Sequence, residues 1–92
     1  MPLSQRVTFK TMLKKENRIA VPRIVRWQYK LEPLEILKVT VSVVGAMGVK
    51  ECFLGKMRKD GRIVIPKLQL ALLRRDEPTL ESFTLEVTLE PA

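Results

Sequence analysis

The sequence predicts a single small domain (residues 1–92), mostly β with two short helices, built from two ββαβ repeats. Three observations predict this fold class: an internal repeat, turns followed by a short strand and a proline, and alternating apolar and polar residues. Repeat one is expected over residues 6–44 and repeat two over residues 49–89, with a linker at 45–48. About forty-five residues bury too little surface to fold alone, so the repeats should pack against each other.

The internal repeat is clearest around two turns. Residues 16–23 read Glu-Asn-Arg-Ile-Ala-Val-Pro-Arg, and residues 60–67 read Asp-Gly-Arg-Ile-Val-Ile-Pro-Lys. At matching positions, both segments have an acid, a turn-forming residue, arginine, isoleucine, two apolar residues, proline and a base. Asp-Gly is a strong hairpin-turn signal, and asparagine tolerates the same positive φ. Further along, the alignment places Val39 with Leu85 and Val41 with Val87.

The same order of elements is expected in each repeat. Branched residues favour the short strands, and proline suits the first position of a helix and also stops one. Around Val39 and Val41, apolar and polar residues alternate, which is typical of a half-buried strand. The expected elements are first strands 6–13 and 49–57, second strands 18–21 and 62–65, helices from Pro22 to near Lys30 and from Pro66 to near Arg75, and closing strands 34–44 and 80–89.

The charge is unevenly distributed. Seventeen Lys and Arg against ten Asp and Glu give a net charge of +7, and the pI is about 10.0. Seven bases lie in residues 10–30 and seven in residues 56–75, whereas eight of the ten acids lie outside these windows. If the repeats pack about a pseudo-two-fold axis, one face becomes positive and the other carries the acids. A symmetric basic face favours a duplex nucleic acid as partner.

The first helix is predicted to have two stripes. Arg23, Arg26 and Lys30 fall on one side, and Ile24, Trp27 and Leu31 form an adjacent apolar stripe. We expect the apolar stripe to face the core and the basic stripe to be available to the partner.

The second helix is apolar nearly all round. It is expected either to be more deeply buried or to form a homodimer contact through Leu70 and Leu73. The single cysteine, Cys52, lies in an apolar stretch and is expected to be a buried small hydrophobe.

Residues 16–23 and 60–67 resemble the hallmark of AbrB-like swapped-hairpin DNA-binding domains, with Asn17 replacing the usual glycine in the first copy. The resemblance implies a small β-barrel of interleaved hairpins with flanking helices, formed here as an intrachain pseudo-dimer. It also implies binding of double-stranded DNA by bases on the hairpins and at the helix starts. By position these bases are Lys14, Lys15, Arg18 and Arg23 in repeat one, and Arg58, Lys59, Arg62 and Lys67 in repeat two. Arg26 is added from the basic stripe of the first helix.

The leading functional hypothesis is a double-stranded DNA-binding protein, either a transcription regulator or a small chromatin (architectural) protein. Phosphate contacts would supply most of the affinity, and Arg18 and Arg62 are the best candidates for reading guanine edges. The alternative is a MazE-type antitoxin with autoregulatory DNA binding. Such proteins need a segment beyond the domain to wrap the toxin, and the sequence stops just after its last expected strand, which counts against this alternative.

Enzymatic activity is not expected. The chain has no histidine, the commonest general base, and lacks Cys/His metal spacing and a glycine-rich phosphate loop. We therefore expect no catalytic residue, metal, cofactor or small-molecule substrate. No leader segment is recognisable, and no apolar run approaches the ~20 residues of a membrane span. These features predict a cytoplasmic, nucleoid-associated protein without a membrane partner.

Overall fold

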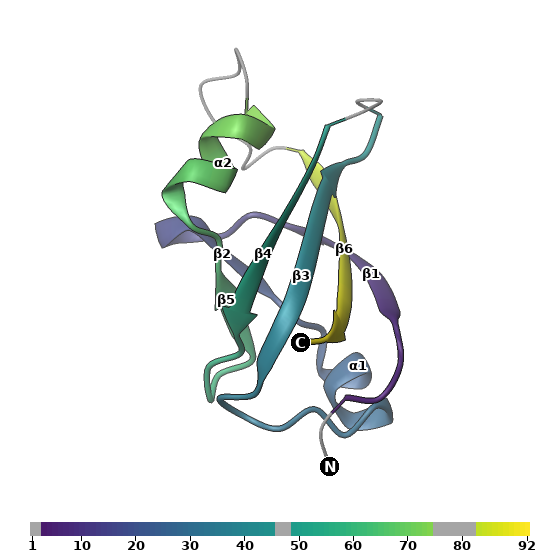
Figure 1. Cartoon of the computed structure of the whole chain (residues 1–92). Helices are drawn as coiled ribbons and strands as arrows, with labels where there is room; N and C mark the ends of the chain where they lie inside the picture. The colour runs from purple at the N-terminus through teal and green to yellow at the C-terminus, as the bar shows by residue number, and fades with distance from the viewer. Residues whose placement is uncertain (1–2, 46–48, 75–82) are drawn as a thin grey trace.

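The structure is a computed structural model that describes residues 3–45, 49–74 and 83–92 (Figure 1). The prediction of a mostly β chain with two helices and antiparallel sheets is confirmed. The elements are β1 (Val7–Met12), the 3-10 turn η1 (Lys15–Asn17), β2 (Arg18–Ala20), α1 (Arg23–Gln28), β3 (Ile36–Val43), β4 (Lys50–Lys56), β5 (Arg62–Val64), α2 (Lys67–Arg74) and β6 (Thr84–Pro91).

Four strands form the larger sheet in the order β1-β6-β3-β4, and each neighbouring pair is antiparallel. The alternating sequence pattern produces one buried and one exposed face. In β3, for example, Leu37 and Val39 are fully buried, whereas Ile36 and Lys38 are exposed. The buried face carries Val7, Phe9, Leu37, Val39, Val41, Val43, Phe53, Leu85, Val87 and Leu89.

Strands β2 and β5 form a separate two-stranded sheet centred on Ile19 opposite Ile63. Both isoleucines are fully buried. The small sheet lies close to Gly55 of β4, where a Cβ atom would lie 3.0 Å from Ile63 Cγ2. The absence of a side chain at Gly55 therefore lets the two layers pack together.

Each sheet combines strands from both repeats. The first strand of repeat one, β1, pairs with the closing strand of repeat two, β6, and β4 of repeat two pairs with β3 of repeat one. Within repeat one, an isolated bridge between Lys14 and Arg18 replaces the extended hairpin that the turn motif predicts. Pairing between repeats thus dominates over pairing within a repeat.

The ladders are arranged about a pseudo-two-fold axis that passes between Ile19 and Ile63 and between Thr40 and Thr88. A rotation of 180° about this axis brings each paired residue of one repeat onto the equivalent residue of the other repeat. Backbone hydrogen bonds follow the same symmetry: Val21 N to Gly61 O (2.9 Å) with Ile65 N to Asn17 O (2.8 Å), and Lys14 N to Arg18 O (2.7 Å) with Arg58 N to Arg62 O (2.8 Å).

The register corrects the alignment of the closing strands. Thr40 lies opposite Thr88 across the axis, so Val39 is equivalent to Val87 and Val41 to Leu89. The predicted equivalences with Leu85 and Val87 are therefore wrong by two residues. A shift of two keeps every side chain on the same face of a strand, so the apolar pattern cannot distinguish the two alignments.

The larger sheet is open within the described residues. Its edge strands β1 and β4 contact β2 and β5, but no ladder joins the two sheets there. The described architecture is thus two packed antiparallel sheets, without the closed barrel that the resemblance implies.

The ends of several elements differ from the prediction. Strand β3 begins at Ile36, two residues later than predicted, after Leu34 with its positive φ of 69°. Helix α1 ends at Gln28, because Lys30 adopts a left-handed conformation with φ of 53° that terminates the helix. The predicted end of the second helix at Arg75 and the predicted start of the last strand lie outside the described residues. Neither described helix is long and apolar enough to cross a membrane.

Three burial predictions are wrong. Val25 of helix α1 and Tyr29 just after it pack on the core. Ile24 and Trp27 of the predicted core stripe are therefore 63% and 76% exposed, whereas Leu31 is buried as predicted. The helix has only six residues, and its orientation depends on the sheets rather than on its own pattern. Cys52 is exposed, since it alternates with buried Phe53 along β4.

The predicted subunit contact on α2 is also wrong for Leu73. Leu73 is 2% exposed, and Leu70 packs against the core of its own chain. The exposed leucines of this helix are Leu68 and Leu72. The hypothesis of deeper burial thus holds for one side of α2, while a different side faces outward.

Candidate nucleic-acid interface

The outer face of the small sheet carries two arginines in equivalent positions. Because Ile19 and Ile63 point into the core, their neighbours along each strand point outward. Arg18 of β2 and Arg62 of β5 thus lie on the outer face, one on either side of the pseudo-two-fold axis. Arg18 is half-buried and Arg62 is exposed.

Four lysine and arginine residues flank these arginines, all of them exposed. Lys14 bridges to Arg18, and Arg58 donates its backbone N–H to the carbonyl of Arg62. Lys15 and Lys59 occupy the adjoining turns. We call the outer face of the small sheet together with these six cations the dyad surface; its members are Lys14, Lys15, Arg18, Arg58, Lys59 and Arg62.

Two acids lie within the dyad surface. Glu16 forms an ion pair with Arg18. Asp60 Oδ2 lies 3.9 Å from Arg18 Nη1 and 3.9 Å from Arg62 Nε, so one carboxylate joins the arginines of both repeats. The sequence does not predict this link, because the link depends on the pairing of β2 with β5. Exposed ion pairs contribute little to stability, so these arginines can exchange partners at small cost.

The turns that carry the lysines need unusual backbone conformations. Glu16 and Asn17 have φ of 64° and 59°, and Gly61 has φ of 80°. Asparagine and glycine adopt this region readily, which explains the turn formers at equivalent positions in the two repeats.

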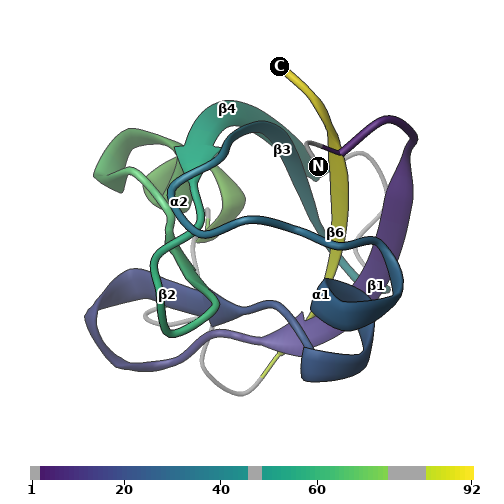
Figure 2. The same cartoon turned by 90° about the horizontal axis from the view of Figure 1, so that it is seen from below.

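The remaining predicted site residues lie on the helices. Arg23 and Lys67 are exposed at the starts of α1 and α2, and the two helices lie on opposite sides of the molecule (Figures 1 and 2). Arg26 is half-buried, and its Nε donates to the carbonyl oxygen of Val21 at 3.2 Å. Its guanidinium group covers Gly61, so Arg26 joins the first helix to the turn of repeat two.

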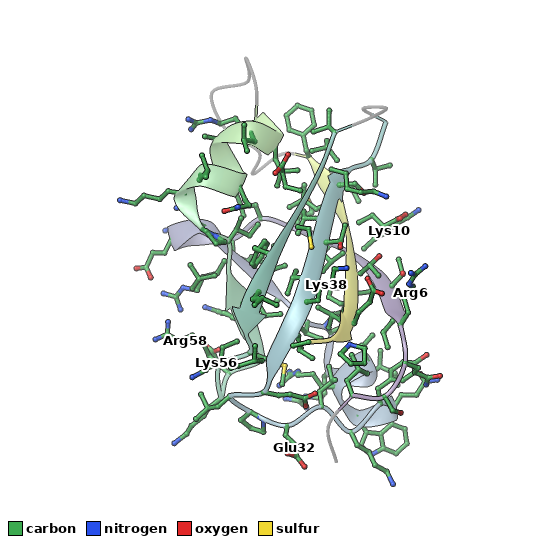
Figure 3. The ribbon with its side chains drawn as sticks, viewed as in Figure 1. Arg6, Lys10, Glu32, Lys38, Lys56 and Arg58 are labelled. Carbon is green, nitrogen blue, oxygen red and sulfur yellow. The ribbon has the colours of Figure 1, made fainter. Side chains whose placement is uncertain are left out.

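The opposite face does not carry acids alone. The outer face of the larger sheet presents cations beside glutamates, and several of them are labelled in Figure 3. Arg6 pairs with Glu90 at 3.4 Å, and Lys10 lies opposite Glu86. The predicted separation of bases from acids is therefore only partial. The cations of this face are Arg6, Lys10, Lys38 and Lys50. Lys56, at the end of β4, lies beside the dyad surface, because it lines a hollow together with Arg58 and Val64 (Figure 3).

Among the described residues, no group of three or more His, Cys, Asp and Glu side chains could hold a metal ion.

No protein-family model and no curated protein matches this chain. Among solved structures, the chain is similar to the solution structure of PHS018 from Pyrococcus horikoshii, with a TM-score of 0.76. The two sequences are 19% identical, and the match covers 99% of this chain and 92% of that chain. At this identity the likeness concerns the fold alone.

Proposed function

We propose that the protein binds double-stranded DNA through the dyad surface, as a transcription regulator or a small chromatin protein. The observation that carries the proposal is the equivalent placement of Lys14, Lys15 and Arg18 with Arg58, Lys59 and Arg62 about one axis. The resemblance of the turn segments to AbrB-like domains supports the same surface.

The physical basis is electrostatic and geometric. Lysines and arginines that neutralise phosphates release counterions, which supplies sequence-independent affinity. A duplex has two-fold axes perpendicular to its length, so a symmetric cationic surface can make equivalent contacts to both strands. We expect Arg18 and Arg62, the cations closest to the axis, to reach base edges, and the lysines to contact phosphates. Arg23 and Lys67 extend the contact toward the two sides.

The test is fluorescence anisotropy of a labelled duplex across a series of salt concentrations. The variant Lys15→Gln/Arg18→Gln/Lys59→Gln/Arg62→Gln removes four cations from the dyad surface. We expect its affinity to fall on the order of 100-fold at moderate salt. The slope of log K against log salt should also become shallower by about 3 to 4, because about 0.9 counterions are released per phosphate contact.

A matched control removes the same charge from the opposite face. The variant Arg6→Gln/Lys10→Gln/Lys38→Gln/Lys50→Gln alters four exposed cations on or beside the larger sheet. It should lose less than about tenfold in affinity and keep the salt slope, since only long-range attraction is reduced. Equal losses in the two variants would assign the affinity to net charge and not to the dyad surface. A folded wild type that binds no duplex at low salt would exclude the proposal.

A further inference from the structure

Both helices expose apolar side chains to solvent. On α1, Ile24 and Trp27 form a ridge (the α1 ridge), and they are 63% and 76% exposed. On α2, Leu68 and Leu72 form a second ridge (the α2 ridge), and they are 66% and 49% exposed. Exposed aromatic and aliphatic side chains in one patch mark surfaces that contact a partner.

The two ridges occupy related places in the repeats. The alignment of the turns makes Ile24 equivalent to Leu68, directly after the cations Arg23 and Lys67 at the helix starts. The two ridges therefore lie on opposite sides of the pseudo-two-fold axis, as the positions of α1 and α2 show in Figures 1 and 2. A shallow hollow of about 350 Å³ lies against Arg23, Ile24 and Trp27, and it can receive a side chain from a neighbour.

The size and charge of the ridges restrict what can cover them. Two large side chains bury at most roughly 300–400 Å², whereas a stable interface buries about 800 Å² on each partner. Cations beside both ridges also repel a second copy in free solution. A flat membrane surface is a poorer fit, because the helices that carry the two ridges lie on opposite sides of the molecule (Figures 1 and 2). These features favour a second copy of the protein as the partner that covers the ridges, provided that a third molecule holds the two copies close together.

The dimensions of the molecule indicate which molecule could hold two copies side by side. Its longest dimension is 39 Å, which corresponds to about 11 base pairs at 3.4 Å each. One turn of B-DNA has about 10 to 10.5 base pairs. Copies bound one turn apart on the same side of a duplex, each with its long dimension along the DNA, would therefore meet at their ends, near which α1 and α2 lie (Figure 1). The phosphates would also screen the repulsion between their cations.

We infer that copies bound next to each other on one duplex contact through the α1 ridge of one copy and the α2 ridge of the next. This inference rests on the proposed function. Each copy has a ridge at either end, so the contact does not close on itself and extends along the DNA. The DNA raises the local concentration of neighbours, so a weak contact suffices.

The test compares a duplex of about 14 base pairs, long enough for one copy, with one of about 45 base pairs, long enough for several. Wild-type protein should bind the long duplex cooperatively, with about tenfold higher affinity per site than the short one. The variant Ile24→Ser/Trp27→Ser should bind the short duplex like wild type and lose the cooperativity. The control Ile36→Ser/Leu54→Ser removes two other exposed apolar side chains and should remain cooperative.

Sedimentation of the free protein should show a monomer, with or without the substitutions. Four results would overturn the inference: non-cooperative binding of wild type to the long duplex, cooperativity retained in the ridge variant, reduced affinity of the ridge variant for the short duplex, or a stable dimer without DNA. If folded wild type fails to bind even the short duplex, the proposed function fails, and this inference fails with it. Normal binding to the short duplex without cooperativity would reject the ridge contact alone.

Discussion

Gly61 occupies the position in repeat two that Asn17 occupies in repeat one, and both have positive φ. The two turns differ in what covers them. A Cβ atom at Gly61 would lie 2.5 Å from Cζ of Arg26, so the guanidinium group rests directly on the glycine. Leu70 occupies the position equivalent to Arg26 in α2 and packs against the core. Arg26 thus has a structural role that the basic-stripe prediction did not include.

The substitution Gly61→Ala tests this role. We expect a loss of about 2 kcal/mol in the free energy of unfolding, measured by urea denaturation. About 1 kcal/mol comes from the positive φ, and about 1 kcal/mol from displacement of Arg26 and loss of its hydrogen bond to Val21. Gly45→Ala is the matched control, because Gly45 also has positive φ but, apart from its chain neighbours, no atom of the described residues lies within 4 Å of its Cβ position. It should cost about 1 kcal/mol.

A double-mutant cycle separates the two contributions. In an Arg26→Ala background, Gly61→Ala should cost only about 1 kcal/mol, since the contact has already been removed. The same cost in both backgrounds would show that Arg26 does not contribute to the turn.

Single residues were predicted with mixed success. The turn formers Asn17 and Gly61 are in the conformations that their chemistry favours. The burial of Trp27 and Cys52 was predicted wrongly, because the local sequence does not indicate which side of a short helix or strand faces the core. The residues of the dyad surface remain predictions that the binding experiment must test.

Strands β2 and β5 have three residues each, fewer than the usual five or six. So short a ladder contributes few hydrogen bonds, and the burial of Ile19 and Ile63 must hold the small sheet on the larger one. The dyad surface therefore depends on this buried pair for its geometry.

Ile63→Ala should cost about 2 to 5 kcal/mol in the free energy of unfolding, because it leaves a cavity between the sheets. Val64→Ala, one residue along the same strand and 40% exposed, should cost less than about 1 kcal/mol. Both are measured by thermal or urea denaturation followed by circular dichroism. Similar small losses for the two variants would mean that the small sheet is not held by its inward isoleucine.

The elements themselves were largely predictable. Alternating residues predicted strand β3, the internal repeat predicted strands β1, β4 and β6 in outline, and the prolines marked the starts of both helices. Helix α1 ends earlier than predicted because Lys30 reverses the backbone. Its pattern of apolar residues gave no information on this, since the end of a short helix is set by the path of the chain that follows.

The two repeats cannot separate without losing their strand partners. Strand β1 pairs with β6, and β3 lies between β4 and β6, so each repeat supplies strands that only the other can pair. A half chain would expose unpaired edges and the apolar faces of both sheets.

We therefore expect the fragments 1–46 and 47–92 to show little regular structure by circular dichroism when each is studied alone at low concentration. Mixed in equal amounts, they should regain the spectrum of the intact chain, because the pairing between repeats needs no covalent link. The covalent link in the intact chain lowers the entropic cost of bringing the two halves together. The mixture should therefore unfold at a lower temperature than the intact chain, and its unfolding temperature should depend on protein concentration. A stable folded monomer of either fragment would contradict this prediction.

The sequence alone determined the kind of each element, its order along the chain and the presence of two repeats, because these depend on local periodicity, turn chemistry and direct comparison of residues. Only the tertiary structure decided which strands pair, the equivalence of Val39 with Val87, and the joining of Arg18 and Arg62 by Asp60. A period of two survives a shift of two residues, and pairing between distant strands depends on how whole faces are buried together. These are properties of the folded molecule that no local pattern contains.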